Sequence, residues 1–89
     1  MAYKLLIVDE KLWEKDCDAI DRKQLLRIFQ AIQKLEKDPW DGNIQVKQLK
    51  DYALADFRLR LGNYRVLFNK DEDRKMILLL RILHRSKLY

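Results

Sequence analysis

Residues 57–68 read Phe57-Arg58-Leu59-Arg60-Leu61-Gly62-Asn63-Tyr64-Arg65-Val66-Leu67-Phe68, the most regular stretch of this chain. Apolar and basic residues alternate as far as Gly62-Asn63, and strand-forming residues resume after that pair. Alternation with a period of two predicts a β-strand, and a Gly-Asn pair suits the tight primed turns that join antiparallel strands. The stretch therefore predicts a β-hairpin.

The turn also predicts which residues face each other. With Gly62-Asn63 as the loop, Arg60 lies opposite Arg65, and Arg58 lies opposite Leu67. Opposed residues share one face of a sheet, and like charges opposed across strands cost from a few tenths to about 1 kcal/mol per pair. The apolar face is expected to hold Phe57, Leu59, Leu61, Tyr64, Val66 and Phe68, and the other face Arg58, Arg60 and Arg65.

Three arginines on one face indicate an anionic partner. A solvated basic face that only deters aggregation between sheet edges is the alternative. Arginine rather than lysine at all three positions favours the partner, because a planar guanidinium can bind phosphate through two hydrogen bonds.

Composition and charge agree with a small nucleic-acid-directed protein. The 89 residues are enough for one domain, residues 1–89, and 48% hydrophobic with 37% charged residues is typical of a globular chain. The net charge of +5 is uneven: residues 1–44 hold eight basic and nine acidic residues, whereas residues 45–89 hold eleven and five. A one-sided positive field favours encounters with polyanions.

Several classes of protein are disfavoured. One cysteine, Cys17, excludes an internal disulfide framework and suits a reducing compartment, so we interpret it as structural. With His84 as the single histidine, no zinc-type ligand set forms within one chain, which leaves a cation site built from carboxylates as the alternative, and we expect no cofactor. The apolar run of residues 5–8 is too short for a signal peptide or a membrane span. We expect a cytoplasmic protein without a membrane partner.

The remaining elements follow from periodicity and capping residues. Residues 3–8 predict a strand that is buried on both faces or lies within the sheet, and Asp9 caps a short helix after it. Asp21 begins a second helix that ends near Lys37, with apolar residues at helical spacing. Residues 43–55 have no clean period and are expected to connect elements, carrying Lys47 and Lys50 towards the basic face. Residues 75–83 predict an interior strand.

The expected fold class is α+β in the order β-α-α-β-β-β. Two helices pack on one face of a mainly antiparallel four-stranded sheet, and the opposite face stays available.

Two motifs together carry a family resemblance. They are the hairpin with Leu49-Lys50 before it, and Leu80-Arg81-Ile82-Leu83-His84-Arg85-Ser86-Lys87-Leu88-Tyr89. The chain resembles a RelE-type toxin of the RelE/ParE superfamily. The resemblance implies a ribosome-dependent endoribonuclease that cuts messenger RNA in the ribosomal A site and is silenced by a cognate antitoxin. Such enzymes need no metal: the 2′-hydroxyl of the RNA attacks the adjacent phosphorus, giving a 2′,3′-cyclic phosphate and a 5′-hydroxyl.

The resemblance also suggests roles for individual residues. Arg65 would bind the scissile phosphate, Arg60 and Arg58 would stabilise charge or grip the RNA backbone, and Tyr89 would orient or deprotonate the 2′-hydroxyl or stack on a base. Some relatives have lysine where this chain has Arg58 and Arg60, and arginine cannot give up a proton near neutral pH. His84 is therefore the better proton carrier if it faces the site. The expected contacts with RNA or the ribosome are Lys47, Lys50, Arg81, Arg85 and Lys87, and either Arg81 or Arg85 could serve the site.

Each assignment has a structural alternative. Tyr89 could be an end residue or fill a gap in the core, and His84 could be a structural hydrogen bonder. Trp13 and Trp40 are better explained as packing aromatics than as base-stacking platforms, and Tyr64 should lie in the core. At the level of function, the alternatives are a ParE-like toxin that poisons DNA gyrase and a non-catalytic nucleic-acid-binding module.

Overall fold

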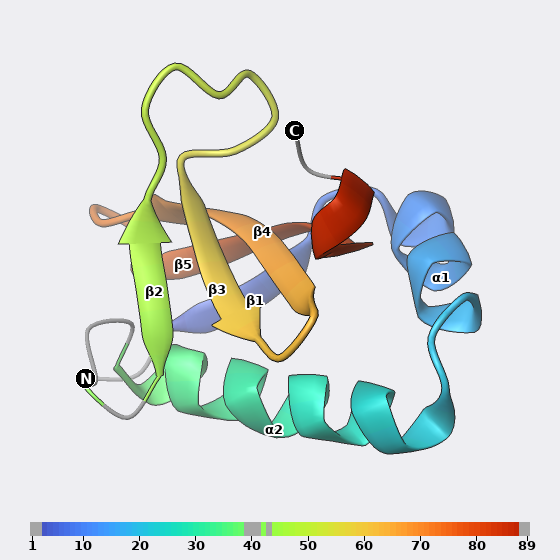
Figure 1. The fold of residues 1–89 in the computed structure, drawn as a ribbon. Coiled ribbons are helices and arrows are strands. Elements are labelled where there is room, and N and C mark those ends of the chain that lie inside the picture. Colours follow the sequence, from blue (N-terminus) through green and yellow to red (C-terminus); the bar gives the residue numbers. More distant parts are fainter. Residues whose placement is uncertain (1–2, 39–41, 43, 88–89) are drawn as a thin grey trace.

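The hairpin lies in a five-stranded sheet flanked by two helices (Figure 1). The computed structural model describes residues 3–38, 42 and 44–87. The elements in chain order are β1 (Lys4–Ile7), α1 (Glu10–Asp18), α2 (Arg22–Lys37), β2 (Gln45–Gln48), β3 (Phe57–Leu61), β4 (Tyr64–Asp71), β5 (Met76–His84) and the short 3-10 helix η1 (Arg85–Lys87).

The sheet has the strand order β1-β5-β4-β3-β2, with β1 parallel to β5 and every other pair antiparallel. The predicted α+β class is confirmed, but there is one strand more than expected. Residues 45–48, predicted to be part of a connection, form the edge strand β2, which pairs with β3 from Gln45↔Arg60 to Gln48↔Phe57. Its single apolar residue, Val46, packs against the core, while polar residues occupy the rest of the strand, as is common at a sheet edge.

The first strand corrects a second expectation. The run Leu5 to Val8 suggested burial on both faces, yet β1 is the other edge strand. Leu5 and Ile7 pack against the core, whereas the Leu6 side chain, on the opposite face, is 47% exposed. The interior strand is β5, as predicted, because it lies between β1 and β4.

Both helices begin where the capping residues predict. The Asp9 carboxylate accepts a hydrogen bond from Leu12 N at 3.1 Å, and the Asp21 carboxylate accepts one from Gln24 N at 3.0 Å. Each bond satisfies a backbone donor that has no partner within the first helical turn. The capping bonds therefore fix where α1 and α2 begin.

The main core lies between these helices and the predicted apolar face of the hairpin. The hairpin register is the predicted one, from Leu61↔Tyr64 to Phe57↔Phe68. Trp13 is buried and packs in this core, which confirms its structural interpretation, whereas Trp40 lies outside the described residues. The fully buried members are Ile28, Leu35, Leu59, Val66, Phe68 and Ile77.

The Cys17 thiol also contacts this core. Burial raises the pKa of Cys17, which disfavours the reactive thiolate and agrees with a structural role.

The opposite face, called the outer face below, is partly covered. Leu67 is fully buried there against Ala55, with Leu49, Tyr52, Leu80 and Leu83 packed around them. The segment between β2 and β3 therefore folds over part of the face that was expected to stay open.

No helix in the described part of the chain is long and apolar enough to cross a membrane.

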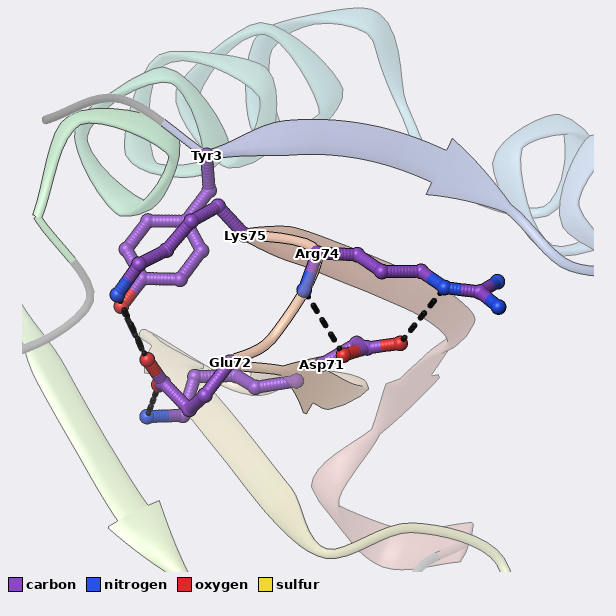
Figure 2. A network of polar contacts seen from close by, with 6 residues as sticks. Tyr3, Asp71, Glu72, Arg74 and Lys75 are labelled. Atoms are coloured by element: carbon purple, nitrogen blue, oxygen red, sulfur yellow. Dashed lines mark hydrogen bonds and ion pairs between the residues drawn. The ribbon is translucent and has the colours of Figure 1, made fainter.

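A polar network closes the end of the sheet where β4 turns into β5 (Figure 2). The Glu72 carboxylate accepts a hydrogen bond from the Tyr3 hydroxyl at 2.9 Å and one from Lys70 Nζ at 2.7 Å. Lys75, at a positive φ of 53°, brings its ammonium to 3.3 Å from the same carboxylate. The network ties the segment before β1 to the β4–β5 turn.

Candidate nucleic-acid interface

The outer face of the sheet gathers basic side chains from three neighbouring strands. Arg60 on β3 lies directly opposite Arg65 on β4, and Arg58 on β3 lies opposite Lys47 on β2. Opposed residues share a face, and Arg58 and Arg60 are two positions apart on one strand, so all four lie on the outer face. Arg60 and Lys47 are exposed, and Arg58 and Arg65 are partly buried.

The guanidinium of Arg65 is held at the β3–β4 turn. Its Nη1 donates to the carbonyl oxygens of Gly62 and Tyr64, each at 2.9 Å. Gly62 has a φ of 56° while Asn63 has no positive φ, the pattern of a type II′ rather than a type I′ turn. The tight turn exposes its carbonyl oxygens to Arg65, which orients that side chain towards this end of the sheet.

The C-terminal segment meets the same turn. Arg85 N donates to the carbonyl oxygen of Asn63 at 2.7 Å, so η1 begins against the loop of the hairpin. Arg85 and Lys87 are exposed on η1. The structure thus brings Arg60, Arg65, Arg85 and Lys87 to one end of the sheet. Tyr89 lies outside the described residues.

Arg81, which with Arg85 was a candidate to serve the site, is bound to Asp16 of α1 instead. Its Nε donates to Asp16 Oδ2 at 2.7 Å and its Nη2 to Asp16 Oδ1 at 2.8 Å, a bidentate ion pair with α1. These hydrogen bonds raise the pKa of Arg81 above its usual value. Asp16 is only 7% exposed, and Oδ2 also accepts from Ile82 N at 3.1 Å. Arg81 therefore ties α1 to β5, so that, of Arg81 and Arg85, only Arg85 lies next to the β3–β4 turn.

His84 lies on the helical side of the sheet rather than with the arginines. It pairs with Tyr64, a residue that packs against the main core, and the two rings meet edge to face with their centroids 5.5 Å apart. His84 Nδ1 lies 2.9 Å from Ser86 Oγ, and Ser86 N donates to the same ring nitrogen at 3.2 Å. The imidazole lines a hollow of about 470 Å³ with Lys15 and Asp16. The structure does not bring His84 onto the face that holds Arg60 and Arg65.

Lys50 is exposed in the segment that covers part of the outer face. It is separated from β2 by Leu49, whose side chain packs into the small outer cluster. Lys50 therefore stands at the border of the arginine-bearing face and not among the paired strands.

The arrangement offers positive charge and hydrogen-bond donors for phosphate groups. Guanidinium groups on adjacent strands can stabilise a developing phosphorane-like charge, but they cannot supply a proton. Within the residues that the structure describes, no cluster of three or more His, Cys, Asp or Glu side chains is arranged to hold a metal ion.

Sequence reasoning missed Asp16. The residue lies three positions after Trp13 and four before Ile20, in the middle of the apolar face of α1. A carboxylate on an otherwise buried helical face is the signal that could have identified it, because a buried charge requires a partner.

Comparison with known proteins agrees with this geometry. The family model described as the ParE toxin of the type II toxin-antitoxin system parDE matches residues 8–89. No curated protein matches the sequence.

Solved structures resemble the fold closely. The toxin-antitoxin complex RelBE2 from Mycobacterium tuberculosis superposes with a TM-score of 0.77 at 22% identity, covering 96% of this chain and 100% of that one. The archaeal RelE-RelB complex from Pyrococcus horikoshii gives a TM-score of 0.76 at 25% identity, covering 98% and 99%. The RelB-RelE complex from Methanococcus jannaschii gives 0.72 at 25% identity, covering 94% of each chain.

The family model spans both the hairpin and the C-terminal motif on which the resemblance was based, and the first two solved structures superpose on 96% and 98% of this chain. The chain therefore belongs to the ParE toxin family of type II toxin-antitoxin systems, within the RelE/ParE superfamily.

Proposed function

We propose that this toxin is a ribosome-dependent endoribonuclease that cleaves messenger RNA in the ribosomal A site, acting in the cytoplasm. The observation that carries the proposal is the meeting of Arg60, Arg65 and η1 at the β3–β4 turn. Two opposed arginines are unfavourable without an anion, and a segment bearing further basic residues docks beside them. A phosphodiester supplies the missing charge.

In the proposed reaction, the 2′-hydroxyl of the RNA attacks the adjacent phosphorus in line. The bond from phosphorus to the 5′-oxygen breaks, leaving a 2′,3′-cyclic phosphate and a 5′-hydroxyl. Arg65 binds the scissile phosphate and Arg60 stabilises the charge that develops on its oxygens, with Arg58 gripping the backbone. The two hydrogen bonds from Arg65 to the turn support this role, because a preoriented donor needs no reorganisation in the transition state.

Proton transfer falls to other groups. We assign to Tyr89 the role of orienting and deprotonating the 2′-hydroxyl. Tyr89 follows η1 by two residues in the sequence. His84 remains a candidate to protonate the leaving oxygen only if the C-terminal segment rearranges on the ribosome, since its ring lies on the helical side. Lys47, Lys50, Arg85 and Lys87 are assigned to contacts with RNA. Arg81 acts within the fold, through its ion pair with Asp16.

A cognate antitoxin is the proposed protein partner. The Pyrococcus horikoshii and Methanococcus jannaschii structures are complexes of RelE with RelB, and both are 25% identical to this chain over nearly its whole length. By analogy, a small protein encoded beside this toxin would hold it inactive.

The test is cleavage of messenger RNA on programmed ribosomes in the presence of a chelator. We expect the wild type to cut, and Arg65→Ala and Tyr89→Phe each to lower the rate on the order of 10²- to 10³-fold, the usual cost of losing one preorganised transition-state donor. Lys11→Ala, an exposed change on α1, is the control and should cut normally. Normal cleavage by both site variants would contradict the assignment.

A ParE-like gyrase poison is the second candidate, because the matching family model is itself described as a ParE toxin. It makes the opposite prediction in a paired assay. If the wild type leaves ribosome-bound messenger RNA intact but inhibits supercoiling by DNA gyrase, the second function replaces the first.

A further inference from the structure

The hollow of about 470 Å³ that His84 lines is left without a ligand by the proposed reaction. It lies between α1, the end of β5 and η1, away from the outer face on which the RNA is cut. Its volume falls in the range of about 300–1,000 Å³ that is typical of small-molecule sites. The chemistry of its lining residues therefore indicates which kind of small molecule it suits.

The inner wall of the hollow is apolar and aromatic. Ile20, which follows α1, and Ile82 of β5 are both buried in this wall. The rings of Tyr64 and His84 also line the hollow, and they meet at an interplanar angle of 89°. Nucleotide bases stack on aromatic side chains whatever their sequence, because every base has a π-face. The wall therefore suits a flat, aromatic ligand.

The rim of the hollow carries positive charge from two elements. Lys15 of α1 and Lys87 of η1 are both exposed and both line the hollow. Among the residues that the structure describes, neither lysine forms an ion pair. A phosphate group between the two ammonium groups would accept charge-assisted hydrogen bonds from both.

Asp16, the one carboxylate among the described lining residues, does not cancel this charge. It accepts two hydrogen bonds from the Arg81 guanidinium, at 2.7 and 2.8 Å, and a third from Ile82 N at 3.1 Å. Because Arg81 already balances the charge of Asp16, the two lysines give the hollow a net positive charge. The hollow is therefore expected to attract anions.

We propose that this hollow is a binding site for a nucleoside monophosphate, a small ligand that combines a flat base with a phosphate. The base packs against the rings of Tyr64 and His84, and the phosphate lies between Lys15 and Lys87. In the proposed reaction the RNA strand lies on the outer face, so the ligand of the hollow is a free nucleotide and not part of the cleaved strand.

The nucleotide also has an effect on cleavage, an inference that rests on the proposed function. Lys15 belongs to α1 and Lys87 to η1, so a phosphate bound by both joins the C-terminal segment to the helical layer. In the proposed reaction, His84 serves only if that segment rearranges on the ribosome. A bound nucleotide stabilises the present arrangement and should slow cleavage.

The experiment uses the full toxin with adenosine monophosphate as the probe, and with adenosine and inorganic phosphate as the two halves of that ligand. His84 is the single histidine of the chain, so the C–H signals of its ring in a proton NMR spectrum report on the hollow. We expect adenosine monophosphate to shift these signals saturably, and to bind about tenfold more tightly than adenosine or phosphate, because only the nucleotide uses both the rings and the lysines.

Two charge reversals on α1 locate the phosphate. Lys15→Glu should weaken binding of adenosine monophosphate by about tenfold, because it replaces an attractive charge at the rim with a repulsive one. Lys11→Glu, the same change outside the hollow, is the control and should bind like the wild type. Both lysines are exposed, so each variant should keep the wild-type circular dichroism spectrum and thermal midpoint.

The second readout is cleavage on programmed ribosomes, which adenosine monophosphate should slow for the wild type but not for Lys15→Glu. If the His84 signals do not move, if phosphate binds as tightly as the nucleotide, or if both variants bind equally, the nucleotide site is wrong. If the nucleotide binds as expected but leaves cleavage unchanged, its effect on the C-terminal segment is wrong. If it binds as expected although the wild type cuts no RNA, the site stands and the nuclease proposal fails.

Discussion

Asp16 is the buried carboxylate that joins α1 to the end of β5. The strand β1 pairs with β5 only from Lys4↔Met76 to Ile7↔Leu79, so the β5 edge continues beyond it. On that edge Asp16 accepts the hydrogen bond of Ile82 N and at the same time neutralises Arg81. A single side chain thus replaces a missing strand partner and closes a charge pair.

Asp16→Ala should lower the free energy of unfolding by about 2–3 kcal/mol, since it removes hydrogen bonds to a charged partner and leaves a partly buried guanidinium unpaired. Asp16→Asn should cost less, because an amide oxygen can still accept from Ile82 N. Urea denaturation measures both. Glu14→Ala, at an exposed position of the same helix, is the control and should stay within about 0.5 kcal/mol of the wild type. An Asp16→Ala variant as stable as Glu14→Ala would contradict this role.

At the scale of elements, the hairpin could be predicted because its signals are local. Alternation assigns the two faces, and the two-residue loop sets the register, so Arg58, Arg60 and Arg65 could be placed on one face without coordinates. The strand β2 could not be predicted, since three of its four residues are polar and it becomes a strand only by pairing with β3. The edge position of β1 was missed because an apolar sequence does not distinguish a strand with one neighbouring strand from a strand with two.

The faces of β5 escaped prediction for a different reason. Phe68 pairs with Leu79 but Leu67 pairs with Arg81, so Leu80 is an extra residue in a β-bulge. A bulge reverses which residues face the core beyond it. Simple alternation from the buried Leu79 would put His84 on the outer face, whereas the bulge turns it towards the helices. Hence the arginines of the candidate site followed from the sequence and the place of His84 did not.

The β3–β4 turn gives a prediction about this element. Gly62→Ala should destabilise the fold by about 1 kcal/mol, because a φ of 56° is strained for a residue with a Cβ even though no atom lies within 4 Å of the new carbon. The rate of RNA cleavage should fall by more than the loss of folded protein explains, because Arg65 and η1 are both anchored to the turn. Thermal unfolding and ribosomal cleavage measured together separate these effects. Gly42→Ala, which has neither a positive φ nor a close neighbour, is the matched control.

At the scale of the whole molecule, the polar networks sit at the two ends of β5. One joins Asp16 to Arg81 beside the candidate site, and the other joins Glu72 to Tyr3, Lys70 and Lys75 at the opposite end (Figure 2). Hydrogen bonds from Lys70 and from Tyr3 lower the pKa of Glu72 from its usual 4.5 to about 2. Protonation of Glu72 therefore acts at the end of β5 that is opposite to Arg60 and Arg65.

The pH dependence of stability follows from that shift. Because the pKa of Glu72 is lower in the folded state, its stabilising contribution is present above about pH 4.5 and is lost as the pH falls towards about 2. Urea denaturation of the wild type and of Glu72→Gln should differ at pH 6 and converge near pH 2. High salt should reduce the difference at pH 6, since the carboxylate is exposed. A difference independent of pH between these limits would show that the charge of Glu72 is not responsible.

The central position of β5 has a consequence for how the toxin is made. The strands β1 and β4 both pair with β5, which is the last of the described strands to be synthesised. The partner of β1 therefore lies more than sixty residues further along the chain. Such distant pairing makes folding wait for late segments. The nascent polypeptide cannot complete its sheet until residues 76–84, which supply the strand between β1 and β4, have left the exit tunnel.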